Sequence, residues 1–425
     1  MEIPGFRQIA QTGVIYVTEQ AARLGYTPGH PDWSNLGQGS PEVGPIADGA
    51  PRLNSIHHVA SALHHYAPVE GLRALRQKVA DFYNYNYRSR SVSKYTYHNV
   101  CIAGGGRQAL GRIVAGFKDI NMGHFLPDYT AYEELLNAFS RFNPIPILLE
   151  KENDYLIQPD LLRKEIVGRG LRALLVSNPC NPTGQLIVPD QCAQWVSLAR
   201  ELECSLIMDE FYSHYIYDTA HTSAGVTMHS SASYVEDVEQ DPVIIVDGVT
   251  KNWRYPGWRV SWIVGPSAVI DMVSSTGSFL DGGANHLMQH EVLSLLEPAH
   301  YQKEQQAIRA LFSKKRAFML ERLTSMGIIV RCPPAGGFYV WADLSTLPPP
   351  LNQSRAFFHA ALEERVIVVP GYFFDVNPGG RRTKNRRYTD HCRISFGPKM
   401  SVLERGLAGL ARVISKAGKK SAAHS

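Results

Sequence analysis

The sequence lacks the features of a membrane, secreted or metal-binding protein. Its six cysteines are spread along 425 residues, and no two of them form a CxxC pair or a zinc-ligand spacing. No stretch approaches the ~20 consecutive apolar residues that a membrane span requires. The first residues contain no apolar signal core, because Glu2, Arg7 and Glu19 interrupt it. We therefore expect a cytoplasmic protein with reduced thiols and no metal centre.

A strong excess of charge of one sign is also missing. The formal net charge is +4 and 19% of the residues are charged, which gives no case for a nucleic-acid partner. The densest basic run, 381–387, directly follows an Asn-Pro-Gly-Gly turn at 377–380. We interpret this run as an exposed, solvated loop.

The sequence does contain a regular alternation of short apolar runs and amphipathic segments. The runs 173–176, 205–208, 243–246 and 260–264 predict buried strands, and helical spacing fills 189–203. Buried strands separated by helices indicate an α/β fold, a mostly parallel sheet with helices on both faces. Ligands of such sheets bind beyond the carboxyl ends of the strands.

The chain is long enough for two domains. We predict a large domain over 51–300 and a smaller α+β domain over 301–425. Residues 1–50 are expected to join the small domain.

The most informative segment is Thr250–Arg259, because it places a lysine after a strand and an arginine eight residues later. A lysine in a dry pocket loses its charge and becomes a nucleophile toward an aldehyde. The guanidinium of Arg259 suits a phosphate, to which it donates two parallel hydrogen bonds. An aldehyde together with a phosphate describes pyridoxal 5'-phosphate (PLP), with Lys251 as the residue that binds it.

Polar residues follow two other predicted strands. Asn181 lies in a doubled Asn-Pro motif at 178–184, where its amide can donate to an anionic ring oxygen. Asp209 follows the next strand, where a carboxylate can hold the proton on a pyridine nitrogen. Tyr212 is three residues further on and can reach the ring oxygen. The alternatives are an ordinary turn at 178–184 and a helix N-cap at Asp209.

Three further features support a PLP site only in combination with the residues above. Gly105 and Gly106 precede a helical pattern, and bare amides at a helix N-terminus bind phosphate. Tyr129 supplies an aromatic ring that can lie against a flat cofactor. Arg393 lies within an apolar strand and needs an anionic partner, either a substrate carboxylate or a structural salt bridge.

Residues 35–400 resemble a fold-type I PLP enzyme of the class I/II aminotransferase family, within the aspartate aminotransferase superfamily. The order and spacing of the motifs above carry the resemblance. It implies that Lys251 holds PLP as an internal aldimine and moves the proton between Cα and C4'. It also implies the following contacts: Asp209 to the pyridine nitrogen, Asn181 and Tyr212 to O3', Tyr129 on the ring, Gly105, Gly106, Arg107, Thr250 and Arg259 around the phosphate, and Arg393, Gln38, Gly39 and Asn181 at the substrate carboxylate.

The resemblance also implies a homodimer with shared sites, because Tyr66 matches a tyrosine that reaches the phosphate of the neighbouring subunit. Two positions depart from the family pattern. Gly248 stands where a serine or threonine often binds the phosphate, and Arg107 stands where a small or amide residue is common. Thr250 or backbone amides are expected to compensate for Gly248.

The resulting expectation is an aminotransferase that moves the amino group of an α-amino acid to a 2-oxo acid. The alternative is a PLP-dependent lyase, cyclase or oxygen-dependent oxidase that diverts the same quinonoid intermediate. A PLP-sensing regulator needs a DNA-binding domain, and residues 1–50 are too short and too rich in glycine and proline to supply one. Apart from Arg52 and Arg254 there is no candidate for a second carboxylate, so aromatic or aliphatic amino acids fit the sequence slightly better.

Overall fold

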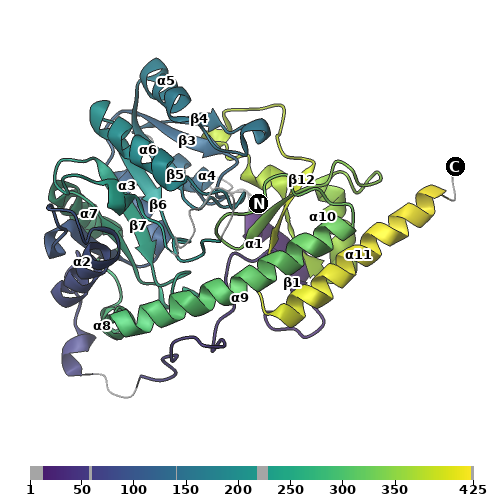
Figure 1. Cartoon of the computed structure of the whole chain (residues 1–425), viewed down its shortest axis with the longest axis horizontal. Coiled ribbons are helices and arrows are strands. Elements are labelled where there is room, and N and C mark those ends of the chain that lie inside the picture. Colours follow the sequence, from purple (N-terminus) through teal and green to yellow (C-terminus); the bar gives the residue numbers. More distant parts are fainter. Residues whose placement is uncertain (1–12, 57–59, 140, 218–227, 423–425) are drawn as a thin grey trace, which may run out of the picture.

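A seven-stranded sheet forms the centre of the protein (Figure 1). The structure is a computed structural model that describes residues 13–56, 60–139, 141–217 and 228–422. The strands lie in the order β2 (Val100–Ala103), β8 (Ser261–Val264), β7 (Val243–Gly248), β6 (Ser205–Asp209), β5 (Leu171–Ser177), β3 (Asn121–Leu126) and β4 (Asn143–Leu148). All neighbouring pairs are parallel except the two that involve β8. The prediction of a mostly parallel sheet is confirmed.

Helices cover both faces of this sheet (Figure 1). On one side α3 (Gly106–Ala115) contacts α7 (Ser267–Leu280), α4 (Tyr132–Asn137) and strands β2, β7 and β8. On the other side α5 (Pro159–Arg169) contacts β5, and α6 (Pro189–Glu201) contacts β6. Strands β5 and β6 are parallel neighbours joined through α6, the ordinary crossover of a parallel sheet. The remaining helices are α1 (Gly13–Ala22), α2 (Arg73–Tyr87), α8 (His286–Leu295), α9 (Pro298–Ser325), α10 (Ser354–Glu363) and α11 (Met400–Ala422).

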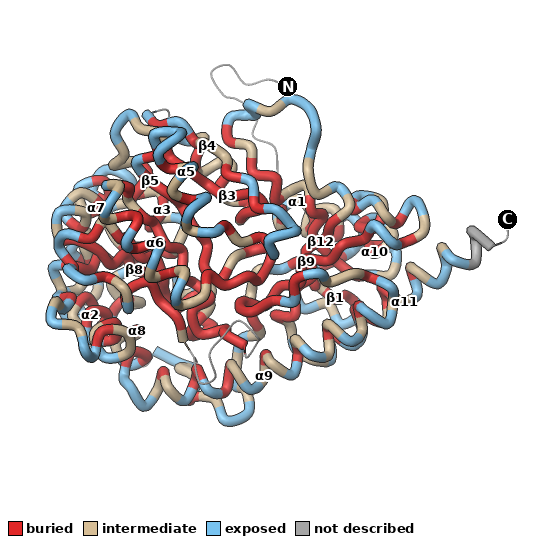
Figure 2. The backbone as a smooth tube through the Cα atoms, turned by 45° about the horizontal axis from the view of Figure 1, so that its top comes forward, coloured by how far each residue is buried: buried red, intermediate tan, exposed pale blue. Residues whose placement is uncertain are grey.

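The central strands are buried along almost their whole length, which explains their continuous apolar runs (Figure 2). Strand β7 is buried at every position, and β5 at every position but one. None of the helices in the described parts of the chain is long and apolar enough to cross a membrane.

Two smaller sheets are built from C-terminal strands, and one of them also contains a strand from the N-terminal part of the chain. Strand β9 (Tyr339–Asp343) pairs antiparallel with β12 (His391–Ser395), which pairs with β11 (Val369–Pro370). Strand β1 (Ser34–Asn35) pairs parallel with β10 (Val366–Ile367). The N-terminal segment thus lies beside C-terminal strands, although residues 1–12 fall outside the described part of the chain. The division into domains at 50 and 300 stays a prediction.

The candidate residues meet at one edge of the central sheet. Strands β5, β6 and β7 are parallel neighbours, and Ser177 pairs with Asp209, which pairs with Val246. The segment 178–184, Asp209 and Lys251 therefore lie at the carboxyl ends of three adjacent strands, as the sequence predicts.

Candidate active site

Lys251 lies three residues after β7 with its backbone fixed from two sides. Its carbonyl oxygen accepts hydrogen bonds from the Tyr215 hydroxyl (2.9 Å) and from the Arg254 amide (3.0 Å). Its Nζ donates to the carbonyl oxygen of Gly39, which comes from the N-terminal segment. The amine therefore lies where the central sheet meets that segment.

The surroundings of Lys251 favour its neutral form. Burial lowers the pKa of its amine to about 7, and the nearby guanidinium groups of Arg393, Arg259 and Arg107 add to this effect. The carboxyl group of Asp209 opposes the shift in part. A neutral amine at physiological pH is the form that attacks an aldehyde.

Asp209 is a buried carboxyl group at the end of β6. Its Oδ2 accepts a hydrogen bond from the Tyr132 hydroxyl at 2.7 Å, and the Phe211 amide lies 3.5 Å from its Oδ1. Burial raises the pKa of the Asp209 carboxyl to about 6. Within the described part of the chain no lysine, arginine or histidine forms an ion pair with it. A buried carboxylate of this kind accommodates a cation supplied by a ligand, such as a protonated ring nitrogen.

Arg393 is a buried guanidinium group on β12. It donates from Nη1 to Asn181 Oδ1 (2.9 Å) and from Nη2 to the carbonyl oxygen of Gly37 (2.6 Å). Its Nε is buried, and no residue in the described part of the chain forms a hydrogen bond with it. Among the residues that the structure describes, no carboxylate pairs with it. The alternative of a structural salt bridge is therefore not met, and the group is available to an anion.

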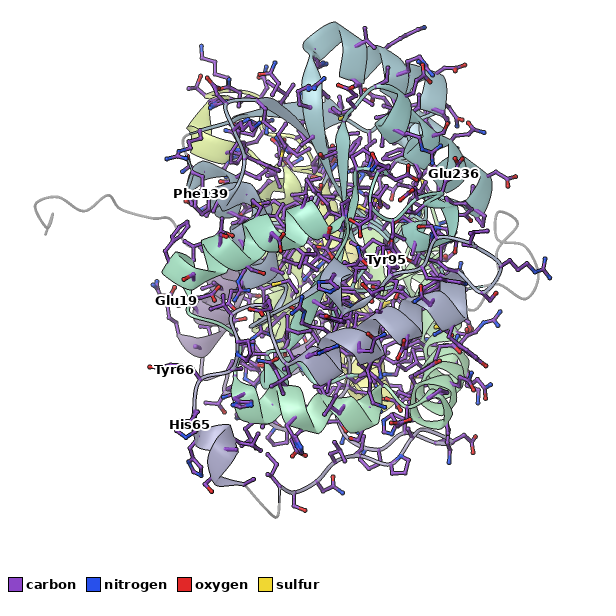
Figure 3. The ribbon with its side chains drawn as sticks, turned by 90° about the vertical axis from the view of Figure 1, so that its left-hand side faces the viewer. Glu19, His65, Tyr66, Tyr95, Phe139 and Glu236 are labelled. Carbon is purple, nitrogen blue, oxygen red and sulfur yellow. The ribbon has the colours of Figure 1, made fainter. Side chains whose placement is uncertain are left out.

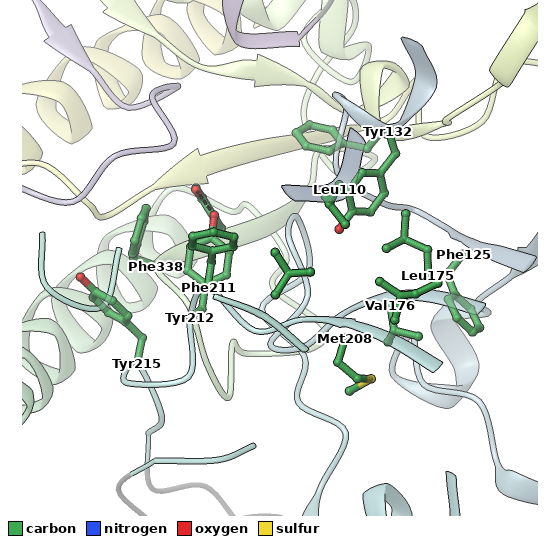
Figure 4. Packing of buried hydrophobic residues seen from close by; sticks show 14 of the residues in the cluster. Leu110, Phe125, Tyr132, Leu175, Val176, Met208, Phe211, Tyr212, Tyr215 and Phe338 are labelled. Atoms are coloured by element: carbon green, nitrogen blue, oxygen red, sulfur yellow. Dashed lines mark hydrogen bonds between the residues drawn. The ribbon is translucent and has the colours of Figure 1, made fainter. Parts of the chain in front are cut away.

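Asn181 and Tyr212 lie next to this guanidinium group. Because Asn181 Oδ1 accepts from Arg393, the amide nitrogen of Asn181 is the atom left to donate elsewhere. The Tyr212 hydroxyl lies 2.8 Å from the Tyr339 hydroxyl. The Tyr212 ring packs edge-on against Phe338 at a centroid distance of 5.3 Å (Figure 4).

A cup of backbone and hydroxyl groups lies at the start of α3. Gly105 has φ +103°, and a Cβ atom there would lie 1.9 Å from Arg259 Nη2. Glycine at this position therefore allows the guanidinium group to approach the first turn of the helix. The Thr250 hydroxyl is buried and has no hydrogen-bond partner. The Gly105 amide donates to the Ala103 carbonyl oxygen, so the first-turn amides of Gly106 and Arg107, with the Arg259 guanidinium group close by, are the groups that suit an anion.

Gly106, Arg107 and Tyr129 complete this side of the site. A Cβ atom at Gly106 would lie 2.5 Å from the Phe211 ring. Arg107 donates from Nη2 to the Tyr129 hydroxyl at 2.9 Å. The unusual arginine of the cup therefore contacts the ring expected to stack on the cofactor. Gln38 is exposed, and its backbone amide donates to Asn35 Oδ1. The described contacts give its side chain no partner in the site.

The neighbouring strand explains sterically why position 248 is a glycine. A Cβ atom there would lie 2.6 Å from Ser261 Cα and 2.6 Å from the Val260 carbonyl oxygen. Both atoms belong to the backbone and cannot yield as a side-chain tip can. A serine or threonine here would therefore strain the contact with the neighbouring strand, and compensation by the Thr250 hydroxyl stays a prediction.

Tyr66 lies outside this cluster. Its side chain is 95% exposed and projects from the surface beside His65 (Figure 3). Arg52 and Arg254 also have other roles, because both pair with Glu304, at 3.3 and 2.7 Å. They therefore do not offer a free second carboxylate site.

Two residues of the site were missed in the sequence. Tyr132 donates to Asp209, and Tyr339 lies between Tyr212 and Arg393. Tyr132 is three residues after Tyr129, within the same short motif, and this position in the sequence could have indicated that it lies near the site.

These residues fit PLP. Among the described residues Asp209 has no ion-pair partner and the Thr250 hydroxyl has no hydrogen-bond partner, and a side chain at Gly105 would fill the space beside Arg259. Lys251 supplies an amine whose pKa is about 7. Each observation corresponds to one part of the cofactor: the ring nitrogen, the phosphate and the aldehyde.

Comparison with known proteins places the chain in a family. The model of aminotransferase class I and II matches residues 31–410. The aspartate/prephenate aminotransferase of Thermus thermophilus is 26% identical over 384 residues, which are 88% of this chain and 91% of that protein. The arginine–pyruvate transaminase of Pseudomonas aeruginosa is 26% identical over 322 residues, covering 74% of this chain and 76% of that protein.

Solved structures agree in fold. The aspartate aminotransferase of Thermus thermophilus with maleate superposes with a TM-score of 0.76 at 23% identity, covering 96% of this chain and all of that one (100%). An aromatic aminotransferase from Pyrococcus horikoshii superposes with a TM-score of 0.72 at 22% identity, covering 94% and 98% of the two chains. From the family match together with a site that fits the cofactor, we conclude that the chain belongs to the class I and II aminotransferases and is a PLP-dependent transaminase.

Proposed function

We propose that the protein transfers the amino group of an α-amino acid to a 2-oxo acid, with Lys251 as the residue that binds PLP and moves the proton. The observation that carries the proposal is the position of Lys251 just after β7, beside the carboxyl ends of β5 and β6, where burial also lowers the pKa of its amine to about 7. An amine that is neutral near pH 7 serves both as nucleophile and as general base. When bound, PLP supplies an electron sink that acidifies the Cα–H bond of the amino acid.

The surrounding residues have complementary roles in this proposal. Asp209 holds a proton on the pyridine nitrogen, which its buried position and lack of a cation support. Asn181 and Tyr212 donate to the ring oxygen. Tyr129 lies against the ring, and its bond to Arg107 fixes its orientation.

The phosphate is bound in the cup at the start of α3. The amides of Gly106 and Arg107, the hydroxyl of Thr250 and the guanidinium group of Arg259 are the proposed donors. The amide of Gly105, expected from the sequence to join them, donates to the Ala103 carbonyl oxygen instead. The unpaired Thr250 hydroxyl and the close approach of Arg259 to Gly105 support this assignment.

The substrate is an α-amino acid whose carboxylate pairs with Arg393. The buried guanidinium group without an acidic partner supports this, because a carboxylate accepts two parallel hydrogen bonds from an arginine. The carbonyl oxygen of Gly39 accepts a hydrogen bond from Lys251 Nζ, so Gly39 lies next to the proposed carboxylate site. The sequence also predicted Gln38 there. The relatives are named for aspartate, prephenate, arginine and aromatic amino acids, so their names share only the α-amino acid chemistry. The preference for aromatic or aliphatic side chains stays a prediction.

The protein is proposed to act as a homodimer in the cytoplasm. Tyr66 is 95% exposed and does not reach the site of its own chain, which supports a role at the site of a second subunit. All six cysteines are free thiols, in keeping with a reducing compartment.

Borohydride reduction tests the role of Lys251. Reduction of the PLP-loaded protein fixes the cofactor to the lysine that binds it, and peptide mass spectrometry identifies that residue. We expect the label on Lys251 and none in a Lys251→Ala variant. A label on another lysine of the wild-type protein would overturn the assignment.

A further inference from the structure

Tyr339 is a buried tyrosine that contacts three groups of the proposed site. It is the first residue of β9 and has no solvent-exposed surface (0%). Its hydroxyl lies 2.8 Å from the Tyr212 hydroxyl, and its ring lies under the Arg393 guanidinium group at 4.3 Å from Cζ to the ring centroid. A Cβ atom at Gly39 would lie 3.1 Å from the Tyr339 hydroxyl. The hydroxyl is therefore paired with Tyr212, and a side chain at position 39 would crowd it.

The pairing of two phenols has a chemical consequence. Each hydroxyl has one proton, so only one of the two can donate within the pair. If Tyr339 donates to Tyr212, the proton of Tyr212 is left for a third acceptor. A hydroxyl whose oxygen accepts a hydrogen bond is itself a stronger donor, because neighbouring bonds polarise one another.

Arg393 favours this direction of donation. A positive charge over the ring of Tyr339 stabilises developing negative charge on that phenol and makes it the better donor of the two. Burial raises the pKa of the Tyr339 hydroxyl to about 12, with Arg393 opposing the shift. Burial raises the pKa of Tyr212 well above the usual tyrosine value, and its bond to Tyr339 adds to this. Both hydroxyls thus keep their protons near neutral pH.

We propose that Tyr339 is a positioning residue that donates to Tyr212 and so strengthens the hydrogen bond from Tyr212 to the ring oxygen of the bound cofactor. This inference rests on the proposed function, in which Tyr212 donates to that oxygen. In this proposal Tyr339 acts on the ring oxygen only through Tyr212. It thereby connects that oxygen with Arg393, the residue proposed to bind the substrate carboxylate.

The visible absorbance of the resting, PLP-loaded protein reports this hydrogen bond. Donation to the ring oxygen withdraws negative charge from it and weakens its hold on the proton of the adjacent lysine nitrogen. Loss of the hydrogen bond from Tyr212 therefore raises the pKa of this lysine nitrogen, which is read as the midpoint of the absorbance change with pH. We expect Tyr212→Phe to raise it by about 1 unit. Tyr339→Phe keeps the ring under Arg393 and should raise it by about 0.3 units.

A double-variant cycle separates this role from a general structural one. Because Tyr339 acts through Tyr212, Tyr339→Phe should add no shift in a Tyr212→Phe background. Tyr388→Phe is the matched control, since the Tyr388 hydroxyl is buried without a partner near the same small sheet, and it should leave the titration unchanged.

Each outcome decides the matter. A shift in Tyr339→Phe that disappears in the Tyr212→Phe background supports the proposal. An unshifted Tyr339→Phe, or a shift that persists in that background, overturns it, while the role of Lys251 stands. A wild-type protein without any lysine-bound PLP absorbance would overturn the proposed function and this inference together.

Discussion

The amine of Lys251 should lose its proton near neutral pH in the cofactor-free protein. Its pKa is lowered from the ordinary 10.5 to about 7, a difference of about 3.5 units. About half of the Lys251 side chains are then neutral at pH 7, compared with roughly 0.03% for a lysine that titrates at 10.5. The neutral fraction, and with it the nucleophilicity, is therefore about a thousandfold higher than for an ordinary lysine.

Competitive labelling with a trace of acetic anhydride measures this value directly. The acetylation rate of each lysine follows its neutral fraction, and mass spectrometry of the digest reports the rates residue by residue across pH 6–10. We expect the rate at Lys251 to level off above about pH 8, with a midpoint near 7. The exposed Lys118 in the same digest serves as the internal reference.

Removal of one positive charge provides the second part of the test. Arg393 makes the largest contribution to the shift among the three neighbouring arginines, so Arg393→Gln should move the midpoint of Lys251 to higher pH. A rate at Lys251 that rises about tenfold per pH unit up to pH 10 would refute the reasoning.

Three further predictions concern the carboxylate site, the sheet and the subunit contact. Arg393→Lys loses bidentate binding of the substrate carboxylate, so kcat/KM for α-amino acids should fall by about 100-fold, as measured by steady-state kinetics; an unchanged value would exclude this site. Gly248→Ser should lower the free energy of unfolding by about 1–3 kcal/mol in denaturant titrations, because the new Cβ would meet the backbone of Ser261. Gly257→Ala is the control, since the space around Gly257 is open, and equal stability of the two variants would contradict the steric account. Tyr66→Phe should weaken PLP retention about tenfold in equilibrium dialysis through loss of a hydrogen bond to the phosphate in the partner's site, and unchanged retention would argue against shared sites.

Much of the site could be predicted because the chemistry lies at strand ends. The apolar runs ending near Ser177, Asp209 and Gly248 are buried on both faces, and parallel pairing brings their carboxyl ends together. Lys251, Asp209 and Asn181 therefore follow from sequence position alone. Their proximity requires only that the three strands be neighbours, which short crossover connections favour.

The remainder depends on tertiary contacts that no local pattern encodes. Strand β8 is antiparallel, although its run at 260–264 resembles the others. The signal was the missing helical pattern between Gly248 and Ser261, since a parallel crossover usually contains an α-helix and this link forms only a short 3-10 turn, Pro256–Trp258. The partner of Tyr339 is 127 residues away in the sequence, so the pair forms only when β9 lies over the end of β6. The steric reason for Gly248 likewise depends on the backbone of a neighbouring strand.

The most direct test of the account is a single-turnover reaction of the PLP-loaded protein with a panel of α-amino acids, followed by the absorbance of the cofactor. The account predicts that at least one amino acid converts the cofactor to its pyridoxamine form with release of an equal amount of the matching 2-oxo acid, and that a 2-oxo acid reverses the change. Release of ammonia or peroxide without the pyridoxamine form would contradict transamination and favour a lyase or an oxidase.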